Sequence, residues 1–134
     1  MINIEDQLQK DEGFRQFPYH DTVGKLTIGI GRNLQDKGIS KAEALYLLHN
    51  DINEFETQLK ERLYWFEQIH EDAQAVLIMM CFNMGLGGLL QFQKTLEHLK
   101  NENYKMAADE ILNSKWANQV GQRAVNYSEI LRKI

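Results

Sequence analysis

The segment from Glu71 to Met84 constrains the fold more than any other, because it is apolar nearly all round. A helix without a polar face lies at the centre of a protein, so the other elements are expected to pack around it. The run Gly85-Leu86-Gly87-Gly88 is expected to break this helix. Its longest apolar run, residues 75–82, is too short to span a bilayer, which argues against stable membrane insertion. Further short helices, which complete a helical body, are predicted at residues 89–101, 103–113 and 118–133.

The N-terminal region contains a segment with a different pattern. Residues 14–31 alternate in polarity on either side of the turn residues Asp21-Thr22-Val23-Gly24, which predicts a β-hairpin. Gly29 and Gly31 fall within its second strand, where glycine marks a bulge or a close approach of the backbone. Residues 33–39 are predicted to form a loop.

Two helices flank this hairpin in the sequence. Residues 3–12 predict a short helix, with Asn3 as its N-cap and Gly13 as the residue that ends it. The capping box Ser40-Lys41-Ala42-Glu43 begins a second helix, which is expected to run to about residue 63. A small β-hairpin lobe beside a helical body predicts the α+β class.

Composition excludes several kinds of function. Acidic residues outnumber basic ones by 19 to 15, which is not the charge balance of a nucleic-acid-binding protein. The single cysteine, Cys81, can form neither an internal disulfide nor a cysteine-rich zinc site. The N-terminus has no signal-peptide pattern, so synthesis in the cytoplasm is expected. No metal is expected, because the histidines show no ligand spacing: His20, His49, His70 and His98.

Glu12 is the first candidate catalytic residue. It continues the apolar stripe formed by Ile4 and Leu8, and it lies at the C-terminal end of the predicted helix. Desolvation and the negative end of the helix dipole would both favour its protonated form, as a general acid requires. The alternative is that Glu12 is a solvated glutamate at a helix end with no catalytic role. From the sequence pattern alone, this alternative is favoured.

Asp21 and Thr27 are the second and third candidates. Taken with Glu12, Asp21 would provide two carboxyl groups on separate rigid elements, one protonated and one ionised, as glycoside hydrolysis uses. The Thr27 hydroxyl could approach the Asp21 carboxylate or a water held by it. The alternatives are an aspartate that only stabilises a turn and a threonine on the surface of a strand.

Three segments of the sequence carry a resemblance to a known family. They match its active-site signature, in which Glu, Asp and Thr stand among glycines and aromatics: Asp11-Glu12-Gly13-Phe14-Arg15, Tyr19-His20-Asp21-Thr22-Val23-Gly24 and Leu26-Thr27-Ile28-Gly29-Ile30-Gly31. The sequence resembles the phage-type lysozymes, or endolysins, which are the muramidases of glycoside hydrolase family 24. The stretch from Arg32 to Ser40 is shorter than in the T-even phage members, which implies a smaller β lobe. The resemblance covers the whole chain, and later matching segments are residues 82–85, 92–96 and 116–124.

The resemblance implies a lysozyme-like α+β fold and a role for each matching residue. Residues 1–134 would form a single catalytic domain, with a small β-hairpin lobe and a larger helical body, a cleft between them and a long helix linking them. Glu12 would be the general acid, and Asp21 would position or activate the attacking water with help from Thr27. Substrate-binding roles would fall to Arg123, Gly29 and Asn83.

The reaction implied is hydrolysis of the β-1,4 bond between N-acetylmuramic acid and N-acetylglucosamine in peptidoglycan, with inversion and lysis of the cell. No cofactor is implied. A monomer that uses a holin-type pore to reach the periplasmic wall is expected. A lytic transglycosylase, or a wall-binding or phage structural module without activity, stays open as an alternative. The candidate basic patch for the anionic envelope is formed by Lys115, Arg123, Arg132 and Lys133.

Overall fold

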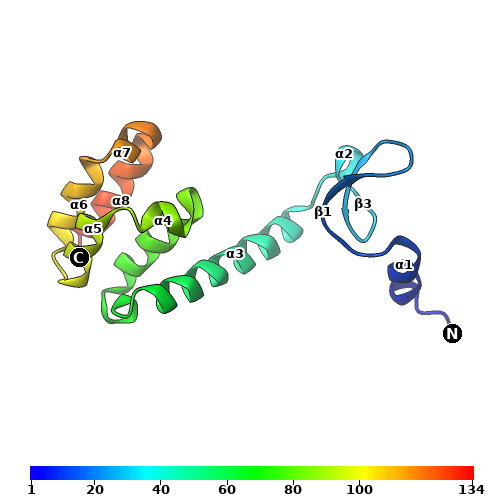
Figure 1. Cartoon of the computed structure of the whole chain (residues 1–134), viewed down its shortest axis with the longest axis horizontal. Helices are drawn as coiled ribbons and strands as arrows, with labels where there is room; N and C mark the ends of the chain where they lie inside the picture. The colour runs from blue at the N-terminus through cyan, green and yellow to red at the C-terminus, as the bar shows by residue number, and fades with distance from the viewer. The chain divides into compact units, whose positions relative to one another are not determined.

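The computed structural model describes every residue from Met1 to Ile134. The chain divides into two compact units, Met1–Leu47 (unit 1) and Leu48–Ile134 (unit 2). All three strands belong to unit 1, whereas unit 2 is entirely helical (Figure 1). The α+β class predicted from the sequence is therefore confirmed.

Unit 1 begins with the predicted N-terminal helix, α1 (Ile4–Glu12). The Asn3 side chain accepts a hydrogen bond of 3.0 Å from the Asp6 N–H, which satisfies a donor that the first helical turn leaves free. Gly13 ends the helix in the left-handed region, with φ 69°. Both predicted caps are confirmed.

The sheet of unit 1 is antiparallel, in the order β1 (Arg15–His20), β2 (Leu26–Gly29) and β3 (Arg32–Asn33). The register of β1 against β2 is interrupted by a bulge. Arg15 pairs with Gly29 and Tyr19 with Thr27, so β1 advances by four residues where β2 advances by two. Pro18 lies inside this irregular part of an edge strand, where its lack of an N–H costs no hydrogen bond in the sheet.

Two sequence predictions in this region are wrong. The second strand ends at Gly29 and not at Gly31, because Ile30 and Gly31 form the turn into β3. Part of the predicted loop at residues 33–39 is a short helix, α2 (Leu34–Lys37). The Asn33 side chain caps it by accepting a hydrogen bond of 3.0 Å from the Asp36 N–H. This helix has only four residues, which is too short to produce a helical pattern in the sequence.

Glu43 joins three parts of unit 1. The predicted capping box at the start of α3 (Lys41–Arg62) is confirmed: Ser40 N–H donates to Glu43 Oε1 at 2.8 Å, and Glu43 N–H donates to Ser40 Oγ at 3.1 Å. Arg32 of β3 pairs with the same carboxylate, through Nη1 to Oε1 at 2.8 Å and Nη2 to Oε2 at 2.6 Å. The Arg32 and Ser40 hydrogen bonds lower the pKa of Glu43 from 4.5 to about 2.

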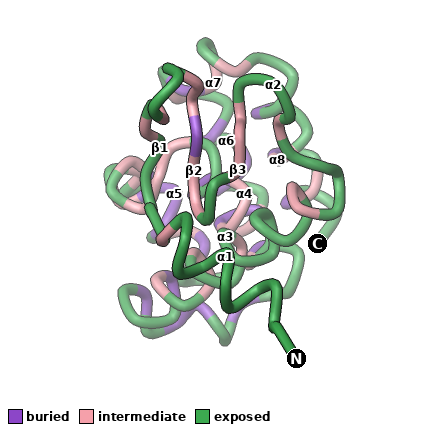
Figure 2. The backbone as a smooth tube through the Cα atoms, turned by 90° about the vertical axis from the view of Figure 1, so that its right-hand side faces the viewer, coloured by how far each residue is buried: buried purple, intermediate pink, exposed green.

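Unit 1 has no apolar core of its own. Thr27 is its one buried residue, and every residue of α1 is exposed (Figure 2). The stripe expected to desolvate Glu12 is therefore not buried, since Ile4 is 71% and Leu8 47% exposed. Polar contacts hold the unit instead, such as the Leu26 N–H donating to Gln35 Oε1 at 3.2 Å.

Unit 2 is built around α4 (Glu71–Leu89), which contributes six buried residues, more than any other helix. The predicted central helix is therefore confirmed. By length and mean hydropathy, 1.3 over its most apolar window, α4 could cross a membrane, as many core helices could. The other elements of unit 2 are the end of α3, η1 (Phe66–Gln68), α5 (Gln93–Lys100), α6 (Tyr104–Leu112), α7 (Lys115–Val120) and α8 (Gln122–Arg132).

Two glycines decide where the helices of unit 2 break. Gly85 breaks α4 with φ 76° and ψ 164°, as the glycine run predicts, but residues 86–89 return to helix. The predicted helix at 89–101 therefore begins only at Gln93. The helix predicted at 118–133 begins earlier, at Lys115, and Gly121, with φ 58°, separates it into α7 and α8, a break that was not predicted.

The Glu43 pair predicts how stability depends on pH. A carboxylate whose pKa is lower in the folded than in the unfolded state stabilises the fold above its unfolded pKa, and this stabilisation is lost as pH falls through the folded pKa. For Glu43 the loss should run from pH 4.5 down to about 2. Glu43→Gln keeps the capping box but removes the charge, so its free energy of unfolding should fall below that of the wild type near neutral pH. The difference should shrink across this window in denaturant titrations.

Glu56→Gln, which removes an exposed pair with Lys60 on α3, is the control for Glu43→Gln. An equal effect of the two substitutions on the free energy of unfolding would contradict the assignment.

Gly85 and Gly87 predict opposite effects of the same substitution on one helix. Gly85 has a backbone conformation that is almost restricted to glycine, so Gly85→Ala should lower the free energy of unfolding by about 1–3 kcal/mol. Gly87 is helical and a Cβ there would meet no atom within 4 Å, so Gly87→Ala should raise it by about 0.5–1 kcal/mol. Chemical denaturation of the two variants checks both signs. Destabilisation of similar size in both would show that the kink is not the cause.

Candidate active site

Glu12 is the last residue of α1, and its side chain is exposed. It lies against the turn between β2 and β3. A Cβ atom on Gly31 would stand only 2.9 Å from Glu12 Oε2 and 3.0 Å from its Cδ. No hydrogen bond within unit 1 holds the carboxylate. The two elements border a hollow of about 370 Å³, lined by Glu5, Leu8, Gln9, Glu12, Ile30 and Gly31.

Asp21 lies in the turn between β1 and β2, and one of its carboxylate oxygens holds that turn. Oδ1 accepts hydrogen bonds from the N–H groups of Val23 at 3.0 Å and Lys25 at 2.8 Å. Gly24, with φ 84°, completes the turn and donates its N–H to the Asp21 carbonyl at 3.0 Å. Oδ2 makes no hydrogen bond within the unit. The side chain therefore has one structural oxygen and one that is free for chemistry.

Thr27 occupies the middle of β2 and is only 3% exposed, so it is not the surface residue considered as an alternative. Its hydroxyl donates to the Lys25 carbonyl at 2.9 Å. It therefore makes no hydrogen bond to the Asp21 carboxylate. Because its one proton is committed, Oγ1 can take part in a further hydrogen bond only as an acceptor.

Strand β2 lies between the two regions that carry the candidate carboxyl groups. Gly31, which lies against Glu12, follows one end of β2, and the Asp21 turn precedes the other end. The four residues of β2 span about 10 Å, from three steps of roughly 3.3 Å. Strand β1 has six residues but pairs along the four residues of β2, because its bulge takes up the extra residues. The glycines of the second strand predict a bulge or a close approach there, but the extra residues lie in β1, which contains Pro18.

Gly29 and Gly31 differ in their surroundings despite similar backbone conformations, with φ 70° and 69°. A Cβ on Gly29 would meet nothing within 4 Å, so its surface is open to a ligand. The close backbone approach predicted for one of these glycines occurs at Gly31. Gly31 was not among the site residues predicted from the sequence.

Asn83 and Arg123 belong to unit 2, where the structure brings them to the same hollow of about 370 Å³. Asn83 Oδ1 accepts a hydrogen bond of 2.8 Å from Trp116 Nε1, which orients its amide. Arg123 is exposed in the first turn of α8. The remaining lining residues are Leu48, Ile52, Ile78, Met79, Phe82 and Tyr127.

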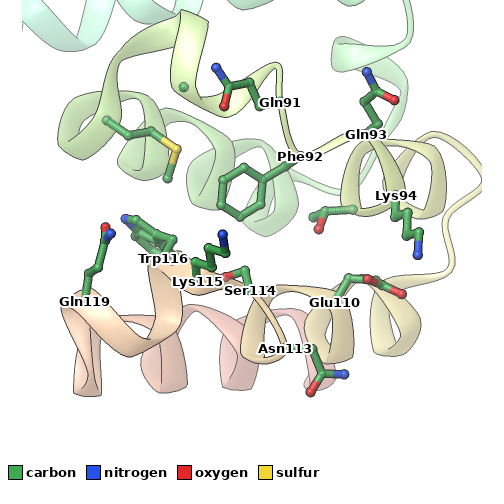
Figure 3. Close-up of a pocket in the computed structure, with 13 residues that line it drawn as sticks. Gln91, Phe92, Gln93, Lys94, Glu110, Asn113, Ser114, Lys115, Trp116 and Gln119 are labelled. Atoms are coloured by element: carbon green, nitrogen blue, oxygen red, sulfur yellow. The ribbon is translucent and has the colours of Figure 1, made fainter.

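A larger hollow of about 600 Å³ lies elsewhere on unit 2 (Figure 3). Phe92 and Lys94 approach it from one side, and Glu110, Lys115 and Trp116 border it from α6 and α7. Two segments that carry the family resemblance, residues 92–96 and 116–124, thus meet here. The Trp116 ring also packs edge-to-face on Phe92, with ring centroids 6.2 Å apart.

Other residues considered in the sequence have structural roles. Burial raises the pKa of Cys81 to about 11, which keeps its thiol protonated and unreactive. The His70 ring caps α4 by accepting a hydrogen bond of 3.0 Å from the Asp72 N–H. Arg132 forms an ion pair with Asp109, so part of the expected basic patch is neutralised. No three His, Cys, Asp or Glu side chains form a group that could hold a metal ion.

Comparison with known proteins identifies the family. The sequence profile described as phage lysozyme matches residues 9–133. "Probable T4-type lysozyme 2" of Dictyostelium discoideum is 26% identical over 152 aligned residues, which cover 91% of this chain and 89% of that protein. "Endolysin" of Salmonella phage P22 is 29% identical, covering 79% and 76% of the two chains.

A third relative is much longer than this chain. "Pre-baseplate central spike protein Gp5" of Enterobacteria phage T4 is 24% identical, and the match covers 97% of this chain but 28% of that protein. The profile match extends over nearly the whole sequence and includes Glu12, Asp21 and Thr27. The chain therefore belongs to the phage lysozyme family of glycoside hydrolases.

Proposed function

We propose that this chain hydrolyses the β-1,4 bond between N-acetylmuramic acid and N-acetylglucosamine in peptidoglycan, with inversion at the anomeric carbon. The observation that carries the proposal is the pair of carboxyl groups at the two ends of β2. Glu12 has a carboxyl free of hydrogen bonds within its unit and beside a hollow, and Asp21 has one free oxygen on a rigid turn. Two such carboxyl groups are what glycoside hydrolysis requires.

Glu12 acts as the general acid and donates its proton to the oxygen of the leaving sugar. Its place at the end of α1, against the turn that follows β2 and beside the hollow, supports this role. Substrate that fills the adjoining hollow would lie against this carboxyl.

Asp21 and Thr27 position the attacking water. The free Oδ2 of Asp21 accepts one proton of the water, and Thr27 Oγ1 accepts a hydrogen bond from the other, because its own proton is held by the Lys25 carbonyl. A water that donates both protons in this way directs a lone pair at the anomeric carbon. Its attack on the face opposite the leaving group inverts the configuration.

Inversion rather than retention is proposed because Asp21 and Thr27 are assigned to a water between the two carboxyl groups. Inverting glycosidases keep their carboxyl groups about 6.5–9.5 Å apart to leave room for water, whereas retaining enzymes need about 5–5.5 Å.

The other candidate residues serve in binding the polymer. Arg123 offers a charge and Asn83 an amide beside an apolar hollow, a combination that suits a sugar with acidic substituents. Gly29 has an open face that a sugar could approach. We infer that the two units work together as one catalytic domain.

The substrate is proposed to be the bacterial cell wall. The P22 relative is named an endolysin, which supports synthesis in the cytoplasm of a host and release to the wall through a separate pore. The T4 spike protein shows that a related segment also occurs within a larger phage particle protein. Peptidoglycan is the proposed partner, and the protein is proposed to act as a monomer.

Glu12→Gln should abolish the release of fragments from purified peptidoglycan, with a loss of about 10²–10⁴-fold, because the amide cannot protonate the leaving oxygen. Mass spectrometry should show that wild-type fragments carry one added water, whereas a transglycosylase would form anhydro ends. Asp11→Asn, which removes the neighbouring exposed charge, is the control and should stay active. Unimpaired turnover by Glu12→Gln would refute the assignment.

Asp21→Asn should impair catalysis by roughly 10²-fold or more while the thermal midpoint of unfolding changes little. The physical reason is that asparagine retains Oδ1, which holds the turn, but replaces the free Oδ2 with an amide that cannot accept a proton. Thr27→Val should also be impaired and Thr27→Ser largely active, since serine keeps the hydroxyl. Normal activity of Asp21→Asn in steady-state assays would point to another residue as the base.

A further inference from the structure

We propose that Gly31 is a positioning residue for the Glu12 carboxyl, and that its lack of a side chain is required for catalysis as much as for the turn. This inference rests on the proposed role of Glu12 as the general acid. Gly31 does not touch the reacting atoms in this account. It acts through Glu12.

The first observation is steric. A Cβ atom on Gly31 would lie 2.9 Å from Glu12 Oε2, 3.0 Å from Cδ and 3.1 Å from Cγ. Carbon atoms pack at about 3.5–4.0 Å, so even a methyl group would overlap the carboxyl along most of its length. The bare backbone of the turn is thus in close contact with the Glu12 side chain.

The second observation is that no hydrogen bond within unit 1 restrains Glu12. A glutamate side chain at a helix end has three rotatable bonds and would otherwise sample several rotamers. The turn Ile30–Gly31 therefore acts as a wall that limits where the carboxyl can lie. The same turn borders the hollow beside Glu12, so the wall also leaves the carboxyl open to substrate.

A side chain at Gly31 would displace Glu12 and not the fold. The overlapping atoms are the far end of a flexible, exposed side chain, which can rotate away at little cost. The backbone strain from φ 69° remains, and it is the strain that any L-residue meets in this region. The two effects can be separated because unit 1 contains a matched glycine.

Gly38 is that matched control. It has φ 63° and also follows a short element of unit 1, but a Cβ on it would meet nothing within 4 Å. Gly31→Ala and Gly38→Ala should therefore lower the thermal midpoint of unfolding by similar amounts. Only Gly31→Ala should move the Glu12 carboxyl.

The test compares these two variants with the wild type on soluble peptidoglycan fragments. For Gly31→Ala, kcat should fall by roughly 10²-fold with a much smaller change in KM, because a displacement of about 1 Å at the reacting group costs about that much. Gly38→Ala should keep kcat close to that of the wild type. The 13C resonance of the Glu12 carboxyl, assigned with Glu12→Gln, should shift in Gly31→Ala and not in Gly38→Ala.

The outcomes separate this inference from the proposed function. If Glu12→Gln loses activity but Gly31→Ala behaves like Gly38→Ala in both kcat and the carboxyl resonance, Gly31 has only a backbone role and the inference is overturned. If the resonance moves but kcat does not, the position of the carboxyl is not limiting and the inference is also overturned. If Glu12→Gln itself stays active, the proposed function fails, whatever the resonance shows.

Discussion

The carboxylate of Glu43 is the contact on which unit 1 depends most. Unit 1 buries only Thr27, so it lacks the apolar core that usually holds a sheet in place. Glu43 compensates by accepting hydrogen bonds from Ser40 and from the Arg32 guanidinium, which also donates to the Gly38 carbonyl at 3.2 Å. The Glu43–Arg32 pair thereby links the start of α3, the end of α2 and strand β3. The turn that contacts Glu12 directly precedes that strand.

Polar contacts of this kind hold a unit that buries little of its apolar surface. The Asp21 turn is also held by polar contacts, since Oδ1 accepts hydrogen bonds from the backbone while Oδ2 is free. Thr27 likewise commits its proton to the Lys25 carbonyl and keeps its lone pairs. In both residues the local hydrogen bonds set the orientation of the group proposed to act. The bulge in β1 then brings the ends of a longer strand to the ends of β2.

Unit 2 depends on the opposite principle. Its core is apolar and is organised by α4, whose buried residues include Val76, Leu77 and Met80. Apolar burial is non-directional, so it does not by itself decide where each helix stops. Gly85 and Gly121 interrupt the helices, because each adopts a positive φ that other residues rarely adopt. Trp116 of α7 lines one hollow and Arg123 of α8 lines the other, and Gly121 separates these two helices.

The sequence by itself determined the features that depend on neighbouring residues: the caps of α1 and α3, the turn at Asp21, the apolar helix α4 and the spacing of Glu12, Asp21 and Thr27. Local hydrogen bonds and side-chain periodicity are enough for these. Only the tertiary structure decided that Gly31 lies against Glu12, that β1 bulges at Pro18 and that the Thr27 hydroxyl bonds Lys25. These features depend on the register in which the strands pair and on which distant residues a turn contacts. Patterns among neighbouring residues do not determine either.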